Sequence, residues 1–172
     1  MGSGAYGDLR SLRILVVDDN FQMRTILGSV LIGAGVTNIH YATNGLEALK
    51  VMMSASIDLA YVDHDMPGGD GLEFVSKVRD SDSAFRMIPI IMVTAHSDMR
   101  RLINARDRGV NEFLRKPVTA RSILDRLNSV VFHPRPFVIS PAYIGPDRRR
   151  KRATPYEGKE RRRGGYGGQV RL

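Results

Sequence analysis

The stretch that decides the fold is Ile14-Leu15-Val16-Val17-Asp18-Asp19, in which four apolar residues run directly into two acids. A run that is apolar on both faces is typical of a central strand in a parallel sheet. Residues 23–31 then carry apolar side chains at helical spacing, and Gly33 and Gly35 stand where that helix should end. The chain therefore opens with a strand followed by a helix.

The same alternation continues to about residue 132. Further strands are expected at residues 39–42, 59–62, 88–93 and 113–114, and a segment with helical spacing follows each of them. Gly109 stands where the helix after residues 88–93 should end. This pattern predicts the α/β fold class, as a doubly wound five-stranded parallel sheet of the flavodoxin-like type with right-handed crossovers.

The positive charge lies at the C-terminal end of the sequence. From His133 onward there are 11 Lys and Arg against 3 Asp and Glu, so this segment carries the whole formal net charge of +8. It is rich in Gly, Pro and Arg, and its few apolar residues predict disorder in the free protein after about Pro136. We expect an N-terminal extension over residues 1–11, a folded domain over residues 12–132 and an arginine-rich tail over residues 133–172.

Composition excludes several classes of site. The chain has no cysteine, which excludes disulfides and thiolate metal sites, and its four histidines lack the spacing of zinc ligands. No apolar run reaches the roughly 20 residues of a membrane-spanning helix, and the N-terminus lacks the apolar core of a signal peptide. We expect a cytoplasmic protein without a membrane span.

Polar residues follow the predicted strands at their carboxyl ends: Asp18 and Asp19 the first, Asp63 the third, Thr94 the fourth and Lys116 the fifth. Open α/β sheets bind ligands at that edge. Clustered carboxylates need a cation, and Mg²⁺ suits a site made of oxygen ligands. A carboxylate can be the nucleophile of phosphoryl transfer while a metal, an amine and a hydroxyl stabilise the phosphoryl charge. Each residue alone fits a cap or surface role better, but the five together at one edge favour this chemistry.

Over roughly residues 12–132 the chain resembles CheY-like response-regulator receiver domains. The resemblance rests on Val17-Asp18-Asp19-Asn20, Asp63-His64-Asp65-Met66-Pro67, Asp70-Gly71, Val93-Thr94-Ala95 and Lys116-Pro117. It implies a regulator rather than an enzyme, with Asp63 phosphorylated by a histidine kinase or phosphotransfer protein. It also implies a cis Lys116–Pro117 bond and contacts of Thr94 and Lys116 with the phosphoryl group. The implied ligands of Mg²⁺ are Asp19, Asp63 and the backbone carbonyl of Asp65, with Asp18 acting through water.

The tail contains arginine clusters at residues 148–152 and 161–163, with tyrosines between and around them. Arginine pairs with phosphate or with the guanine edge, tyrosine stacks on bases, and an acid such as Asp147 can accept hydrogen bonds from guanine. Composition alone favours nonspecific binding of nucleic acid or anionic lipid, or a merely solvated tail, over a specific nucleotide site.

A second resemblance covers roughly residues 133–163. Arg135-Pro136-Phe137-Val138 and the stretch from Tyr143 to Arg150 are similar to the Cle group, CheY-like proteins whose arginine-rich tail binds cyclic di-GMP and which act at the flagellar motor. The resemblance implies a cyclic di-GMP site and a motor switch protein as partner, with recruitment to the motor. The implied ligand contacts are Tyr143, Asp147, Arg148, Arg149, Arg150, Arg152 and Tyr156. Two alternatives remain open: a plain phosphorelay receiver with a nonspecific basic tail, and a nucleic-acid-binding regulator.

Overall fold

The computed structural model describes residues 9–67, 71–95 and 98–148 of the chain. The strands of its main sheet are β1 (Arg13–Val17), β2 (Asn38–Ala42), β3 (Leu59–Asp63), β4 (Ile90–Thr94) and β5 (Glu112–Arg115). The helices are α1 (Phe21–Gly33), α2 (Gly45–Ser54), α3 (Gly71–Asp80), α4 (Met99–Asp107) and α5 (Ala120–Phe132), with a short 3-10 helix η1 (Ala84–Met87) before β4. Each helix in this part of the chain falls short of the length and apolar character that crossing a membrane requires.

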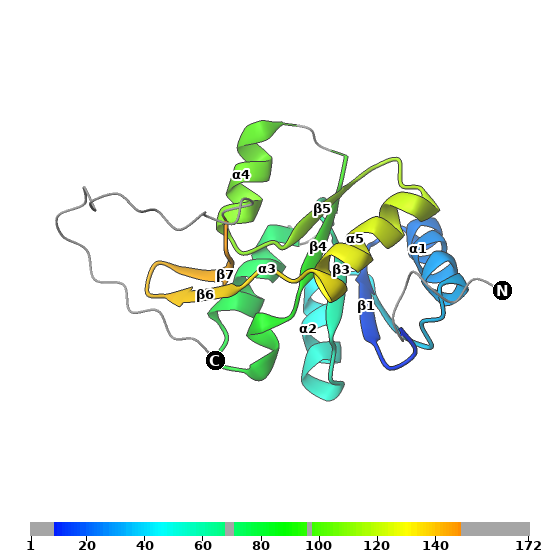
Figure 1. Cartoon of the computed structure of the whole chain (residues 1–172), viewed down its shortest axis with the longest axis horizontal. Coiled ribbons are helices and arrows are strands. Elements are labelled where there is room, and N and C mark those ends of the chain that lie inside the picture. Colours follow the sequence, from blue (N-terminus) through cyan, green and yellow to red (C-terminus); the bar gives the residue numbers. More distant parts are fainter. Residues whose placement is uncertain (1–8, 68–70, 96–97, 149–172) are drawn as a thin grey trace.

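The five strands form one parallel sheet in the order β2-β1-β3-β4-β5, packed between helices (Figure 1). The order reverses between β1 and β3, which makes this a doubly wound sheet and confirms the predicted fold class. The other strand boundaries agree with the expected ranges to within one residue, but β4 begins at Ile90 rather than Ile88. Ile88 ends η1 instead, and Pro89, which has no N–H, contributes only its carbonyl, which accepts from the backbone of Ala60 at 3.0 Å.

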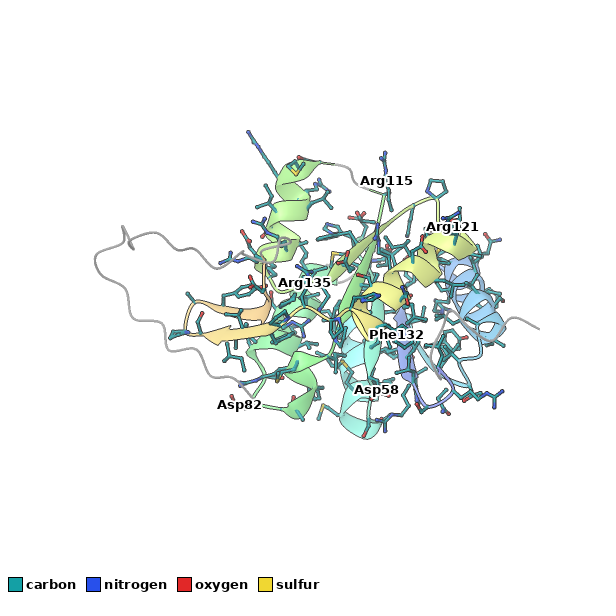
Figure 2. All side chains as sticks on the ribbon, viewed as in Figure 1. Asp58, Asp82, Arg115, Arg121, Phe132 and Arg135 are labelled. Carbon is teal, nitrogen blue, oxygen red and sulfur yellow. The ribbon has the colours of Figure 1, made fainter. Side chains whose placement is uncertain are left out.

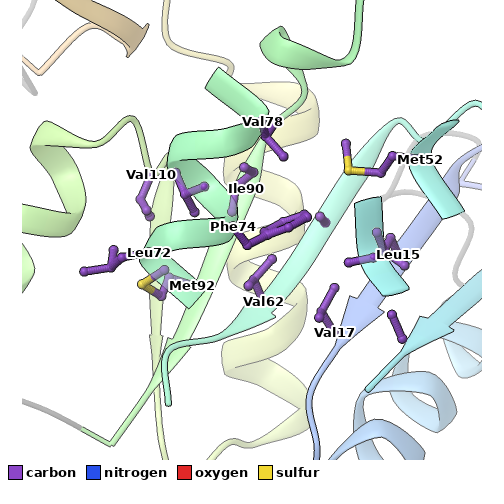
Figure 3. Packing of buried hydrophobic residues seen from close by; sticks show 14 of the residues in the cluster. Leu15, Val17, Met52, Val62, Leu72, Phe74, Val78, Ile90, Met92 and Val110 are labelled. Atoms are coloured by element: carbon purple, nitrogen blue, oxygen red, sulfur yellow. The ribbon is translucent and has the colours of Figure 1, made fainter. Parts of the chain in front are cut away.

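Side chains of the central strands alternate between two buried clusters, one on each face of the sheet. Leu15 and Val17 of β1 belong to the cluster that includes Phe74 of α3 (Figure 3). Ile14 and Val16 belong to the other cluster, together with residues of α1 and α5. Because helices cover both faces, the buried positions of β1 must be apolar, which explains the continuous apolar run from Ile14 to Val17; only Arg13, at the start of the strand, is exposed.

Local sequence signals set the helix ends. The side chains of Asn20, Asn44 and Thr119 cap the first turns of α1, α2 and α5 by accepting from backbone N–H groups. Gly35 and Gly109 follow α1 and α4 with φ of +101° and +95°, a conformation that side chains disfavour. The predicted ends of these two helices are thereby confirmed.

A two-stranded antiparallel hairpin follows α5, formed by β6 (Phe137–Ser140) and β7 (Tyr143–Pro146). This corrects the expectation of disorder after about Pro136 over residues 137–146; residues 149–172 of the tail lie outside the described residues. The expectation weighed the composition of the whole tail. The apolar residues of this first part are instead concentrated in the two strands, and packing on the folded domain offsets the cost of ordering them.

The hairpin packs on the segment between α4 and β5, at the amino edge of the main sheet (Figure 1). Arg79 of α3 lies beneath it, 2% exposed, with its Nε and Nη2 donating to the Gly109 carbonyl at 3.1 and 2.9 Å. The Arg79 guanidinium also stacks on Phe137, 5.1 Å from the ring centroid. Arg135, labelled in Figure 2 at the entry to the hairpin, donates to the carbonyl of Asn111. These contacts attach the start of the tail to the folded domain.

Candidate functional site

The carboxyl ends of four strands bring the predicted site residues to one edge of the sheet. Asp18 directly follows β1, Asp63 ends β3, Thr94 ends β4 and Lys116 directly follows β5. The reversal of strand order between β1 and β3 falls at the same edge, which is where doubly wound sheets bind ligands.

Three carboxylates converge there. Asp18, Asp19 and Asp63 each offer an oxygen within 4.8 Å of the others. Asp18 and Asp63 are 1% and 3% exposed, whereas Asp19 lies at the surface. The backbone N–H of Asn20 donates to Asp18 Oδ1 at 2.8 Å, while the buried Oδ2 has no hydrogen-bond partner among the described residues. A buried oxygen left in this way beside two further carboxylates fits a hard divalent cation such as Mg²⁺.

The amine of Lys116 is the positive charge of the site. Its Nζ lies 2.8 Å from Asp63 Oδ1 and 3.6 Å from Asp18 Oδ2, and the Lys116–Pro117 peptide bond is cis, as expected. Burial disfavours the charge on Lys116, but the hydrogen bond and ion pair with Asp63, aided by Asp18, outweigh burial and raise its pKa. The amine is therefore protonated at neutral pH, in contact with the carboxylate that would become phosphorylated.

The surroundings of the Asp63 carboxylate disfavour its ionised form. Burial raises the pKa of Asp63, and the nearby charges of Asp18 and Asp65 raise it further, against the opposing hydrogen bond from Lys116. A bound divalent cation would reverse this balance, because it favours the ionised form of every carboxylate it contacts. The charge distribution therefore agrees with the donor set in pointing to a metal.

Thr94 and Asp65 occupy different places around this cluster. Thr94 is buried, and its carbonyl accepts from the backbone N–H of Lys116 at 2.8 Å, which holds the ends of β4 and β5 together. The Asp65 side chain is exposed, and its carboxylate is outside the cluster found among the described residues. The metal-binding role of its backbone carbonyl and the phosphoryl contact of Thr94 stay predictions.

Arg24 of α1 supports the site, although it was not predicted as a site residue from the sequence. Its Nη1 donates to the carbonyls of Asp18 and Asp19 at 2.6 and 3.1 Å, which fixes the loop that carries both acids. A signal was present: a cation in the first turns of a helix opposes the helix dipole, so an arginine there suggests a compensating contact.

The predicted tail residues that the structure describes lie at the opposite edge. The Arg148 guanidinium stacks on Tyr143, 4.5 Å from the ring centroid, and pairs with Asp107 of α4 at 3.0 Å. The Tyr143 hydroxyl donates to the Pro146 carbonyl at 2.7 Å. Asp147 is fixed through its backbone, whose N–H donates to the Pro136 carbonyl at 2.7 Å. The other predicted contacts, Arg149, Arg150, Arg152 and Tyr156, lie outside the described residues.

Comparison with known proteins agrees with the fold and the acidic edge. The family described as the response regulator receiver domain matches residues 14–128, so the match ends before the hairpin. The chemotaxis protein CheY1 of Helicobacter pylori is 37% identical over 121 residues, which are 70% of this chain and 97% of that protein. The chemotaxis protein CheY-3 of Vibrio cholerae is 31% identical over 121 residues, 70% of this chain and 92% of that protein.

Solved structures give the same answer. The chemotaxis response regulator CheY4 of Vibrio cholerae superposes with a TM-score of 0.66 at 30% identity, over 70% of this chain and 98% of that one. Receiver domains bind Mg²⁺ at the acidic pocket that Asp18, Asp19 and Asp63 form in this chain. The shared fold, the matched residues and the acidic pocket show that this chain belongs to the response regulator receiver domain family.

Proposed function

We propose that the chain is a response regulator that accepts a phosphoryl group on Asp63 in the presence of Mg²⁺. The observation that carries the proposal is the contact of Lys116 Nζ with Asp63 Oδ1 at 2.8 Å, beside two further carboxylates within 4.8 Å. An amine so close to one carboxylate, with oxygen ligands for a metal around it, suits a site in which charge gathers on a transferring phosphoryl group.

Each residue then has a distinct task. A carboxylate oxygen of Asp63 forms the bond to phosphorus as the bond between phosphorus and the donor's histidine nitrogen breaks, leaving the pair of electrons on that nitrogen. Lys116 keeps its proton and neutralises one phosphoryl oxygen, and the Thr94 hydroxyl donates to another. Asp18 and Asp19, with Asp63 and the Asp65 carbonyl, would hold Mg²⁺, which supplies further positive charge to the phosphoryl oxygens.

The phosphoryl donor in this proposal is a histidine kinase or a phosphotransfer protein. The test uses Asp63→Asn, which keeps the shape of the side chain but removes the nucleophile. Wild-type protein should take up phosphate from a phosphorylated histidine donor or acetyl phosphate, and beryllofluoride with Mg²⁺ should perturb its amide spectrum. Asp63→Asn should do neither, whereas Asp125→Asn, an exposed acid on α5, should match the wild type. An Asp63→Asn protein that responds like the wild type would show that another residue accepts the phosphate.

We also propose that the arginine-rich tail binds cyclic di-GMP, as in the Cle group that it resembles. Two features support this proposal. The arginine cluster at residues 148–152 begins with an arginine held against a tyrosine ring, Arg148 on Tyr143, a pairing suited to stacking and to anion contact. Asp147 stands beside it, in a segment where an acid would be unfavourable for simple attraction to polyanions. The remaining contacts would come from Arg149, Arg150, Arg152 and Tyr156.

The proposed regulator acts by contact with another protein, such as a flagellar motor switch protein. Support comes from the curated relatives, which are chemotaxis proteins. The surface of α4 also leaves apolar side chains open to a partner, since Met99 and Ile103 are 67% and 41% exposed. The regulator would then be recruited to the motor when the tail has bound cyclic di-GMP.

Titration of the full chain with cyclic di-GMP, GTP and single-stranded DNA separates the tail hypotheses. A specific guanine site should prefer cyclic di-GMP and lose about tenfold in affinity in Asp147→Ala, since a good polar contact to a base is worth roughly 1–3 kcal/mol. Asp125→Ala adds the same formal charge on α5 and should leave the affinity unchanged. Equal affinity for all three ligands, or tighter binding in Asp147→Ala, would instead indicate a nonspecific basic tail or a nucleic-acid binder.

A further inference from the structure

Two arginines from separate parts of the chain converge on one carboxylate oxygen where the hairpin meets α4. Asp107 Oδ1 accepts from Arg106 Nε and Nη2 at 3.2 and 3.1 Å, and from Arg148 Nη1 at 3.0 Å. Arg106 and Asp107 belong to the receiver, whereas Arg148 follows β7, 41 residues later. One anionic oxygen is thus shared by two guanidinium groups that packing alone brings together.

The surroundings of this oxygen are positively charged. The hydroxyl of Tyr143 lies in the field of Arg148, Arg135 and Arg79. Arg79 is buried and donates to neutral acceptors, the carbonyls of Gly109 and Arg86 and the amide oxygen of Asn111. Glu112 pairs with Arg135 at 3.8 Å, and Asp107 is the carboxylate that pairs with Arg106 and Arg148. A region where arginine charges gather in this way attracts a further anion.

The groups around Asp107 are accessible to a ligand. The side chains of Arg106, Asp107 and Arg148 are 42%, 40% and 47% exposed. Burial disfavours the ionised form of Asp107, but the hydrogen bonds from Arg148 and Arg106 outweigh burial and lower its pKa, so the carboxylate is charged at neutral pH. The arginine cluster at residues 148–152 begins at this point in the sequence, so a ligand of that cluster would be held next to the end of α4.

We propose that Arg106 and Arg148 form an anion subsite for a phosphate group of cyclic di-GMP, and that the Asp107 carboxylate fills this subsite in the free protein. The proposal rests on the proposed function of the tail and adds receiver residues to its ligand site. A phosphate offers separate oxygens to the two guanidinium groups, whereas Asp107 now offers Oδ1 to both. Ligand binding therefore replaces the Asp107 carboxylate with a phosphate group of the ligand. The stronger the ion pairs of Asp107 with the two arginines, the more Asp107 weakens binding of the ligand.

The test is titration of the full-length chain with cyclic di-GMP near physiological salt. Asp107→Asn keeps the size of the side chain but removes the competing charge, and should tighten binding by about 1.5- to 5-fold, the range for an exposed ion pair. Arg106→Gln removes a guanidinium and should weaken binding by at least about threefold. In the Arg106→Gln background, Asp107→Asn should have a smaller effect than it has alone, because the two residues act on one subsite.

Arg121 and Asp125 provide matched controls. They form an exposed ion pair of 3.8 Å on α5, and Arg121 is labelled in Figure 2 far from the hairpin. Arg121→Gln and Asp125→Asn change the net charge as Arg106→Gln and Asp107→Asn do, and should leave the affinity unchanged. The subsite is refuted if Arg106→Gln binds with the same affinity as Arg121→Gln and Asp107→Asn with the same affinity as Asp125→Asn. It is also refuted if Asp107→Asn weakens binding.

A second measurement guards against an effect of the substitutions on the hairpin itself. In the nitrogen-15 spectrum of the wild-type chain, the side-chain Nε–H signal of Arg106 should move during the titration and saturate together with that of Arg148, while Arg121 stays fixed. A stationary Arg106 signal at saturating ligand refutes the subsite. If the wild-type chain binds no cyclic di-GMP, both the tail function and the subsite fail. Binding that is weakened by Asp147→Ala but not by Arg106→Gln removes the subsite alone.

Discussion

The two glycines with positive φ offer a direct measure of how firmly the hairpin is attached. Gly35 and Gly109 have nearly the same backbone conformation, with φ of +101° and +95°. Their surroundings differ. A Cβ added at Gly35 would meet no heavy atom within 4 Å, whereas one at Gly109 would lie 2.6 Å from the Ile144 carbonyl oxygen of β7 and 2.9 Å from Arg79 Nε. Replacement of each glycine by alanine therefore imposes the same backbone strain, and only Gly109→Ala collides with the hairpin.

The expected losses of stability follow from the backbone strain at both positions and from the collision at Gly109. The left-handed conformation costs an alanine about 1–2 kcal/mol, so Gly35→Ala should lower the free energy of unfolding by that amount. Gly109→Ala should lose the same and about 1–3 kcal/mol more, because a buried arginine and a backbone carbonyl must both move to admit the methyl group. The difference between the two variants then measures the packing of β7 on the α4–β5 segment.

Urea unfolding followed by circular dichroism gives both free energies, and amide signals of β6 and β7 show whether the hairpin stays in place. Gly109→Ala should perturb or release those signals, while Gly35→Ala should leave them unchanged. Equal losses of stability within about 0.5 kcal/mol, with hairpin signals intact in both variants, would refute the docked position of the hairpin.

Three further predictions concern the acidic edge. Lys116→Met should leave Mg²⁺ binding in place but slow phosphorylation by acetyl phosphate about tenfold or more, since it removes the cation 2.8 Å from Asp63; an unchanged rate in a stopped-flow assay would contradict this role. Asp19→Ala should weaken Mg²⁺ binding about tenfold or more, whereas Asp65→Ala, which keeps its backbone carbonyl, should change it much less; titration calorimetry with Mg²⁺ compares the two. In Mg²⁺-free buffer Asp63→Asn should stabilise the protein at neutral pH, because burial and neighbouring acids raise the pKa of the folded Asp63 above its ordinary 3.8. This gain should be absent below that ordinary value, grow as the pH rises to the raised pKa and stay constant above it; a gain in melting temperature that is independent of pH would show that charge is not its cause.

The sequence alone predicted the sheet and the acidic edge because both depend on short-range patterns. The run Ile14–Val17 is apolar at every position, which is typical of a strand covered on both faces. Parallel strands bring their carboxyl ends to one edge, so the residues that follow them, such as Asp18, Asp63 and Lys116, had to meet once the strand order was known. The spacing of Gly35 and Gly109 likewise marked two helix ends without any tertiary information.

Other features were decided only by the packing of segments that are far apart in the sequence. Composition averaged over the tail concealed a hairpin whose order depends on a partner surface: Phe137 stacks on Arg79, and the backbone of β7 lies against Gly109. The meeting of Arg148 with Asp107, 41 residues earlier, has no local pattern at all. Such contacts depend on the surface shape and the charged groups that the folded domain presents, and a linear sequence carries that information only through the complete fold.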